Sequence, residues 1–170
     1  MATQEEMAWL HSMIPAAQAA QRAYGVPASI SLAQCLLESG WGESELAREA
    51  RNFFGIKAHH LNVPDSYIEF PTAEYEDGRR VIVHALFEKY FDAADSFADH
   101  AMLLTQAARY RNAMLMRAKP LAMAAGLQQA GYSTNPSYAQ QLVTLMHDYN
   151  LLQYDTLPPA PAVAAKEVAA

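Results

Sequence analysis

The side chain best placed for acid chemistry is Glu38, a lone carboxylate near the end of an apolar segment and close to Gly40 and Trp41. Unpaired carbonyl groups in the last turn of a helix carry partial negative charge, which opposes ionisation of a nearby carboxyl group. Partial burial by Leu37 and Trp41 would act in the same direction. An acid whose pKa is raised toward neutrality can give a proton to a leaving group. These residues predict a general acid, against the alternative of a glutamate exposed at a helix end.

A second candidate carboxylate lies at Glu74 or Glu76, in a segment of strand-like composition. Side chains alternate along a strand, so both glutamates share one face and Tyr75 takes the other. Either carboxylate could therefore face a cleft, where it would activate water or stabilise a positively charged transition state. The alternative is a charged, solvated hairpin tip.

The helix that must carry Glu38 is predicted over residues 29–39, after Pro27. Ser29 is its expected N-cap, and Gly40 is its expected end because glycine readily adopts the left-handed conformation. The apolar residues recur at three- and four-residue spacing, at Ile30, Ala33, Leu36 and Leu37.

The remaining elements follow a helix, strand, helix order. Helical periodicity marks residues 4–24, with a break or new start at Pro15, and residues 44–50, 95–104, 110–116, 120–130 and 136–149. Strand-like segments are residues 53–58, 66–70, 74–76 and 80–86, with Asp77-Gly78 as a tight-turn signal. This order predicts an α+β domain, mainly helical, with a small antiparallel β-hairpin lobe beside the active-site cleft.

Length and composition predict one domain over residues 1–155, because 170 residues with 52% apolar content supply a core. Residues 156–170 hold three prolines and six alanines and are expected to form a flexible tail. The net charge of −6 argues against nucleic acid as a partner. No secretory signal and no membrane span is visible. The single cysteine, Cys35, excludes an internal disulfide and is expected in the core.

Neither a metal nor another cofactor is expected. His59 and His60 form the only adjacent histidine pair. Neighbouring side chains on an extended segment diverge, and neither Cys35 nor a carboxylate at a recognised ligand spacing accompanies the pair.

Four segments occur in a recognisable order: residues 33–42 (AQCLLESGWG), 52–57 (NFFGIK), 72–75 (TAEY) and 131–139 (GYSTNPSYA). Together they resemble glycoside hydrolase family 73, the bacterial N-acetylglucosaminidases that cut peptidoglycan. The similarity runs from about residue 14 to about residue 152. The resemblance implies a lysozyme-like fold and an endo-β-N-acetylglucosaminidase that acts in the periplasm or the extracellular cell wall.

The resemblance also assigns roles to single residues. It implies Glu38 as the acid and favours Glu74 over Glu76 as the second carboxylate. Tyr132 would orient the acetamido group of the sugar if that group attacks the anomeric carbon. Apart from the resemblance, the residue types indicate Trp41, Asn52, Phe54, Tyr110 and Tyr138 as substrate contacts. Asn52 is also expected to hold its loop in place, and Tyr138 to pack or to contact the sugar at the rim. Of Phe53 and Phe54, one is expected to point inward and the other toward the cleft.

Two other functions stay open. A muramidase or lytic transglycosylase shares this fold and would cleave the other glycosidic bond of the glycan, but residues 52–57 resemble the glucosaminidases. A non-catalytic wall-binding or assembly domain could also keep the fold, although Glu38, Glu74 and Tyr132 favour an enzyme. The expected partner is the peptidoglycan glycan strand, bound by stacking and hydrogen bonds because the chain is acidic, and the protein is expected to be a monomer.

Overall fold

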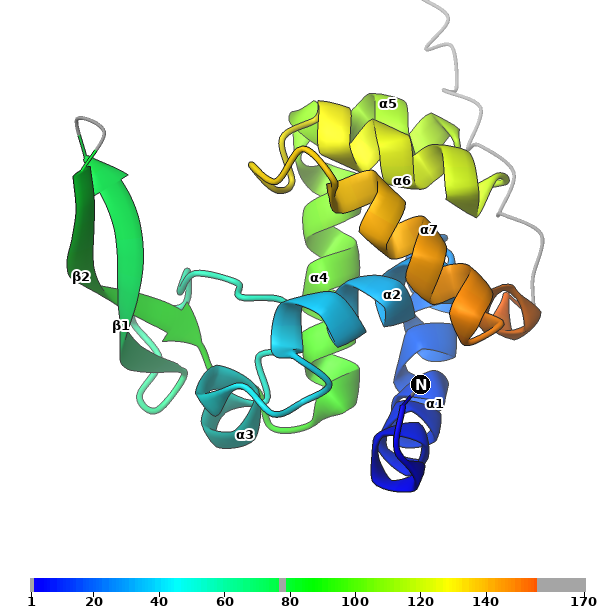
Figure 1. Ribbon diagram of the computed structural model, residues 1–170. Helices are drawn as coiled ribbons and strands as arrows, with labels where there is room; N and C mark the ends of the chain where they lie inside the picture. The colour runs from blue at the N-terminus through cyan, green and yellow to red at the C-terminus, as the bar shows by residue number, and fades with distance from the viewer. Residues whose placement is uncertain (1, 77–78, 156–170) are drawn as a thin grey trace, which may run out of the picture.

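The computed structural model describes residues 2–76 and 79–155, so the predicted tail and the Asp77-Gly78 turn lie outside the described residues. A β-hairpin stands to one side of a helical body (Figure 1). The helices are α1 (Gln4–Tyr24), α2 (Ala28–Ser39), α3 (Glu45–Ala50), α4 (Ala93–Gln106), α5 (Arg111–Leu115), α6 (Pro120–Gln129) and α7 (Tyr138–Asp148). Two 3₁₀ helices, η1 (Ala108–Tyr110) and η2 (Leu151–Tyr154), and two strands, β1 (Tyr67–Glu76) and β2 (Arg79–Glu88), complete the fold. The predicted α+β class is confirmed.

Helix α2 lies at the centre of the helical body, in contact with α1, α6, α7 and η2. Of its 12 residues, only Leu37 and Glu38 are not buried. The predicted apolar positions Ile30, Ala33 and Leu36 are all in the core. Glu38 is therefore the only polar side chain of α2 that is open to solvent.

The start of α2 differs from the prediction that Ser29 is its N-cap. The N-cap is Pro27, without a side-chain cap, and Ser29 lies inside the first turn. Asp155 supplies the missing acceptor: its Oδ1 accepts from the Ser29 N–H at 2.8 Å and its Oδ2 from the Ser29 hydroxyl at 2.6 Å. A carboxylate is favourable at a helix N-terminus, where N–H groups lack partners.

Helix α1 runs through Pro15 without a break, so the predicted break was wrong. Proline removes one backbone hydrogen bond from a helix. Leu10 before it and Ala16, Ala17 and Ala20 after it are buried, and α1 packs against both α2 and α4. Tertiary packing on both sides of the proline thus holds the helix together. None of the described helices combines the length and hydrophobicity needed to cross a bilayer.

Strands β1 and β2 pair antiparallel, from Tyr67 opposite Glu88 to Glu76 opposite Arg79. Residues 66–70 and 74–76, predicted as separate strands, belong to one strand that continues through Pro71. Each strand of a two-stranded sheet has an unpaired edge, which tolerates proline. Residues 53–58 do not form the predicted strand and make only one isolated bridge, from Lys57 to Phe87.

Asn52 fastens the base of the hairpin to the helical body. Its Nδ2 donates to the carbonyl oxygens of Ile56 at 2.8 Å and Glu88 at 2.9 Å, and its Oδ1 accepts from the Ile56 N–H at 3.0 Å. The Tyr90 N–H also donates to the Ala50 carbonyl at 2.8 Å. These bonds join the loop after α3 to the end of β2, as expected for Asn52.

Candidate active site

A cleft of about 850 Å³ opens beside the end of α2, a size typical of ligand sites. Its walls come from the loop after α3, from α4 and η1, and from the segment after α6. The described residues that line it are Glu38, Phe54, Gly55, Ile56, Lys57, His59, His60, Asp99, Met102, Leu103, Gln106, Ala107, Arg109, Tyr110 and Tyr132. The loop at the base of the hairpin, rather than the strands, forms the lobe-side wall.

Glu38 reaches this cleft from the last turn of α2. Although the residue is open to the cleft, the surrounding protein partly desolvates its carboxyl group and raises its pKa, and a hydrogen bond from Tyr138 opposes part of that rise. This is the direction that the sequence predicts for the pKa of Glu38. Gly40 ends the helix at φ 56°, as predicted. Ser39 fixes the turn, because its hydroxyl donates to the Cys35 carbonyl at 2.6 Å and accepts from the Gly42 N–H at 2.8 Å.

Tyr138 lies behind Glu38 and not at the rim of the cleft. It is 2% exposed, and its hydroxyl accepts a hydrogen bond from Gln34 Nε2 at 2.8 Å while bonding to Glu38. Helix α7 packs against α2, which directs this first residue of α7 into the interface. The structure thus favours the packing alternative for Tyr138 over a direct sugar contact.

Tyr132 lines the same cleft as Glu38. Its ring stacks on Tyr138 with centroids 5.5 Å apart and an interplanar angle of 15°, and Tyr110 and His100 lie at 5.8 and 6.1 Å. Burial, and next the charge of Glu38, raise the pKa of Tyr132 well above its ordinary value. The phenol therefore keeps its proton and can donate a hydrogen bond.

The two adjacent phenylalanines divide as predicted. Phe54 lines the cleft and stacks on His100 with ring centroids 3.9 Å apart. Phe53 turns inward, edge-on to Trp9 at 5.9 Å. Tyr110 also lines the cleft, with the Arg109 guanidinium 4.6 Å from its ring centroid.

Two predicted substrate contacts, Trp41 and Asn52, are not among the described residues that line the cleft. Trp41 follows Gly40 with a positive φ of 60°, and its ring packs edge-on against Tyr149 at 4.8 Å. Its expected part in covering Glu38 is not supported by this placement. Asn52 is 1% exposed and uses its amide on backbone groups.

Glu74 pairs with Val81 in the third residue pair from the turn of the hairpin. Its side chain, like that of Glu76, lies outside what the structure describes. The end of β1 and the start of β2 lie at the part of the hairpin farthest from α2 (Figure 1). The backbone therefore does not bring Glu74 beside Glu38.

The cleft also holds charged groups that the sequence analysis did not predict there. Asp99 lines it, and its Oδ2 accepts from the Tyr90 hydroxyl at 2.6 Å. Asp99 lies within the predicted helix 95–104, whose helical periodicity does not by itself mark Asp99 as a cleft residue. Its neighbours Phe97 and His100 are fully buried, a placement that the structure shows and the sequence alone does not.

The prediction that His59 and His60 diverge was wrong. Their rings lie 4.2 Å apart, because the chain curls around the carboxylate of Glu88 instead of extending. His59 Nδ1 is 3.1 Å and His60 Nδ1 is 3.2 Å from Glu88 Oε1. A carboxylate distant in sequence thus accompanies the histidine pair.

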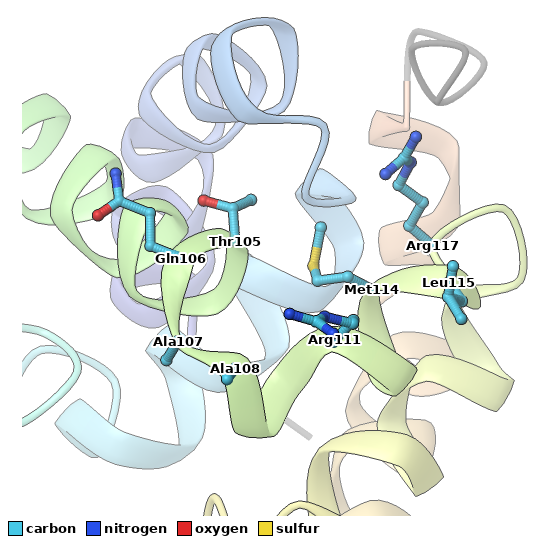
Figure 2. Close-up of a pocket in the computed structure, with 8 residues that line it drawn as sticks. All are labelled: Thr105, Gln106, Ala107, Ala108, Arg111, Met114, Leu115 and Arg117. Carbon is cyan, nitrogen blue, oxygen red and sulfur yellow. The ribbon is translucent and has the colours of Figure 1, made fainter. Parts of the chain in front are cut away.

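A second, smaller hollow of about 220 Å³ lies between the end of α4 and the loop after α5 (Figure 2). Its described lining is Thr105, Gln106, Ala107, Ala108, Arg111, Met114, Leu115 and Arg117. No carboxylate is among these residues, so this hollow is not a candidate for acid chemistry.

Comparison with known proteins identifies relatives of the whole domain. Residues 14–151 match the glucosaminidase family, described as mannosyl-glycoprotein endo-beta-N-acetylglucosaminidase. The exo-glucosaminidase LytG of Bacillus subtilis is 34% identical over 163 residues, 92% of this chain and 56% of that protein. The peptidoglycan hydrolase FlgJ of Escherichia coli K12 is 37% identical over 146 residues, 84% of this chain and 46% of that protein. The chain thus spans about half the length of these curated relatives.

Solved structures of related hydrolase domains are also similar to this chain. The catalytic domain of the autolysin Auto from Listeria monocytogenes superposes with a TM-score of 0.79 at 31% identity, covering 91% of this chain and 90% of that one. A C-terminally truncated glycoside hydrolase domain of Salmonella typhimurium FlgJ gives a TM-score of 0.68 at 34% identity, covering 85% and 97%.

Proposed function

The chain belongs to the glucosaminidase family, and from that premise we propose that it is a peptidoglycan hydrolase. The bond it cuts is the glycosidic bond after N-acetylglucosamine in the glycan strand, the reaction of an endo-β-N-acetylglucosaminidase. The observation that carries this proposal is the presence of Glu38 and Tyr132 in one cleft. The names of the relatives, peptidoglycan hydrolase and exo-glucosaminidase, support the substrate.

Glu38 is the general acid of the proposed reaction. Cleavage of a glycoside needs a proton on the leaving oxygen, because the transition state resembles an oxocarbenium ion. Glu38 is the described carboxyl group of the cleft with a raised pKa. A carboxylic acid that keeps its proton closer to neutrality is suited to this step.

The proposed role of Tyr132 concerns the acetamido group of the sugar and not the leaving oxygen. In a substrate-assisted reaction the acetamido oxygen attacks the anomeric carbon, and the Tyr132 hydroxyl orients that group by hydrogen bonding. In a direct displacement, Glu74 activates the attacking water instead. The family resemblance supports Glu74 in this role. Glu74 would have to approach the cleft together with its hairpin.

The substrate meets the wall formed by Phe54 and Tyr110. Flat aromatic faces suit the C–H surface of a sugar ring, and the acidic chain gains nothing from the anionic groups of the wall polymer. The proposed place of action is the periplasm or the cell wall, where this polymer lies.

Mass spectrometry of the products of purified peptidoglycan tests the proposal. N-acetylglucosamine at the new reducing ends supports it. A reducing N-acetylmuramic acid would identify a muramidase, and an anhydro sugar a lytic transglycosylase. The Glu38→Gln variant is the control for contaminating hydrolases. Binding to the polymer without any product would instead identify a wall-binding domain.

A further inference from the structure

We propose that His59, His60 and Glu88 form a binding site for a late first-row divalent cation, with Zn²⁺ as the reference ion. Among the described residues, this group brings two imidazoles and a carboxylate within 4.8 Å of one another. Two imidazoles and one carboxylate are a donor set that zinc uses in proteins, with a fourth position left for water. His59 and His60 also line the cleft, so the ion would be at its wall.

Two of the three distances between the ligand atoms are close to those around one small ion. Ligands about 2.0–2.2 Å from zinc, at tetrahedral angles, are separated by about 3.3–3.5 Å. The observed separations of Glu88 Oε1 from the two Nδ1 atoms are 3.1 and 3.2 Å. A small movement of the exposed imidazoles would therefore admit the ion without a change of backbone.

Backbone hydrogen bonds hold the carboxylate of Glu88 in place. Glu88 is 2% exposed, and its Oε1 accepts the backbone N–H groups of both His59 and His60. Both backbone donors bind Oε1, so the lone pairs of Glu88 Oε2 remain for a metal bond.

Asp99 is positioned to support a metal-bound His59. Its Oδ2 lies 3.6 Å from His59 Nε2, on the side of the ring away from Glu88. A zinc-bound histidine usually presents its other ring nitrogen to a carboxylate, which fixes the ring and raises its basicity. Asp99 is itself fixed by the Tyr90 hydroxyl at 2.6 Å.

Titration with Zn²⁺ alone, by calorimetry near neutral pH on a chain without an affinity tag, tests the site. We expect one ion per chain and a thermal unfolding midpoint that rises with the zinc concentration, because the native state binds the ion. His60→Ala removes one ligand whose side chain is 58% exposed, so the variant will fold. Its affinity should fall at least about 100-fold, and that of Asp99→Asn by about tenfold, since outer partners contribute 10- to 100-fold.

The matched control is His84→Ala on the hairpin. His84 also faces a carboxylate, Glu69 at 2.9 Å, and is similarly exposed, but it belongs to no group of three metal-binding side chains among the described residues. Its zinc affinity should equal that of the wild type. The proposal is overturned if the wild type shows no one-to-one binding, or if His60→Ala binds as tightly as His84→Ala. The measurement contains no glycan, so its failure would leave the proposed hydrolase untouched.

Discussion

The Tyr138 hydroxyl connects the buried amide of Gln34 to the carboxyl group of Glu38. Gln34 Nε2 donates to it at 2.8 Å, and the hydroxyl in turn bonds to Glu38. Gln34 and Glu38 are one turn apart on α2, whereas Tyr138 begins α7. The position of the acid is thus tied to the packing of α7 on α2, and Tyr132 stacks on the same ring.

Replacing Tyr138 with Phe should move the alkaline limb of the pH profile to higher pH. The hydrogen bond from Tyr138 stabilises the ionised form of Glu38 and lowers its pKa. Its loss raises the pKa further, so the protonated acid persists to higher pH. The measurement is kcat/KM on glycan fragments as a function of pH.

The control for this shift is Tyr149→Phe, which keeps a ring packed against Trp41 and does not line the cleft. Its pH profile should match that of the wild type. A uniform loss of activity in Tyr138→Phe, with the limb unmoved, would mean that Tyr138 acts only through packing.

Replacing Glu38 with Gln should reduce hydrolysis by about 10²- to 10⁴-fold, the usual contribution of general acid catalysis. Gln has the same shape but cannot donate a proton as an acid. The thermal unfolding midpoint should stay close to that of the wild type, because Glu38 is open to the cleft. Turnover of peptidoglycan within a few-fold of the wild-type rate would remove Glu38 from the acid role.

Replacing Asn52 with Ala should destabilise the fold by about 2–4 kcal/mol. Three hydrogen bonds of a buried amide are lost, and each contributes about 0.5–1.5 kcal/mol, more where a buried partner stays unpaired. Urea unfolding measures the difference. Asn112→Ala, at an exposed position, should change stability by less than about 0.5 kcal/mol. If the Asn52→Ala variant keeps normal stability but binds substrate more weakly, Asn52 is a substrate contact, as the sequence predicts.

Local spacing was sufficient for the features of α2 that depend on near neighbours. The apolar repeat located the helix to within one residue, and Gly40 ended it as expected. The bond from Asp155 to Ser29 spans 126 residues, so no local pattern contains it. The continuation of α1 through Pro15 likewise depends on packing against α2 and α4.

In the candidate site, too, some residues could be predicted from their near neighbours in sequence, and others depend on contacts that are distant in sequence. Glu38 and Tyr132 were identified from short motifs, and both line the cleft. Trp41 was expected there because it is close in sequence, but the left-handed turn at Gly40 and Trp41 directs its ring to Tyr149. The carboxylate that accompanies the histidine pair, Glu88, lies on a strand 28 residues further along, so local spacing does not reveal it.

The second catalytic group, besides Glu38, can be identified by comparing variants of the two hairpin glutamates and of Tyr132. Glu74→Gln should reduce activity more than Glu76→Gln, because the family motif includes Glu74, while strand alternation gives both glutamates the same face. A substrate-assisted reaction would make Glu74 less important than Glu38, since the acetamido oxygen is then the nucleophile. Tyr132→Phe should also be impaired, because the sugar group would lose its hydrogen-bond donor.

Rates of these three variants on one glycan substrate, each normalised to its folded fraction, separate the mechanisms. Equal losses in Glu74→Gln and Glu76→Gln would indicate only the general charge of the hairpin. A small loss in Glu74→Gln with a large loss in Tyr132→Phe would support attack by the acetamido group. Full activity of Tyr132→Phe would remove the hydroxyl from the mechanism, and a large loss in Glu74→Gln would then require the hairpin to bring its carboxylate to the cleft during the reaction.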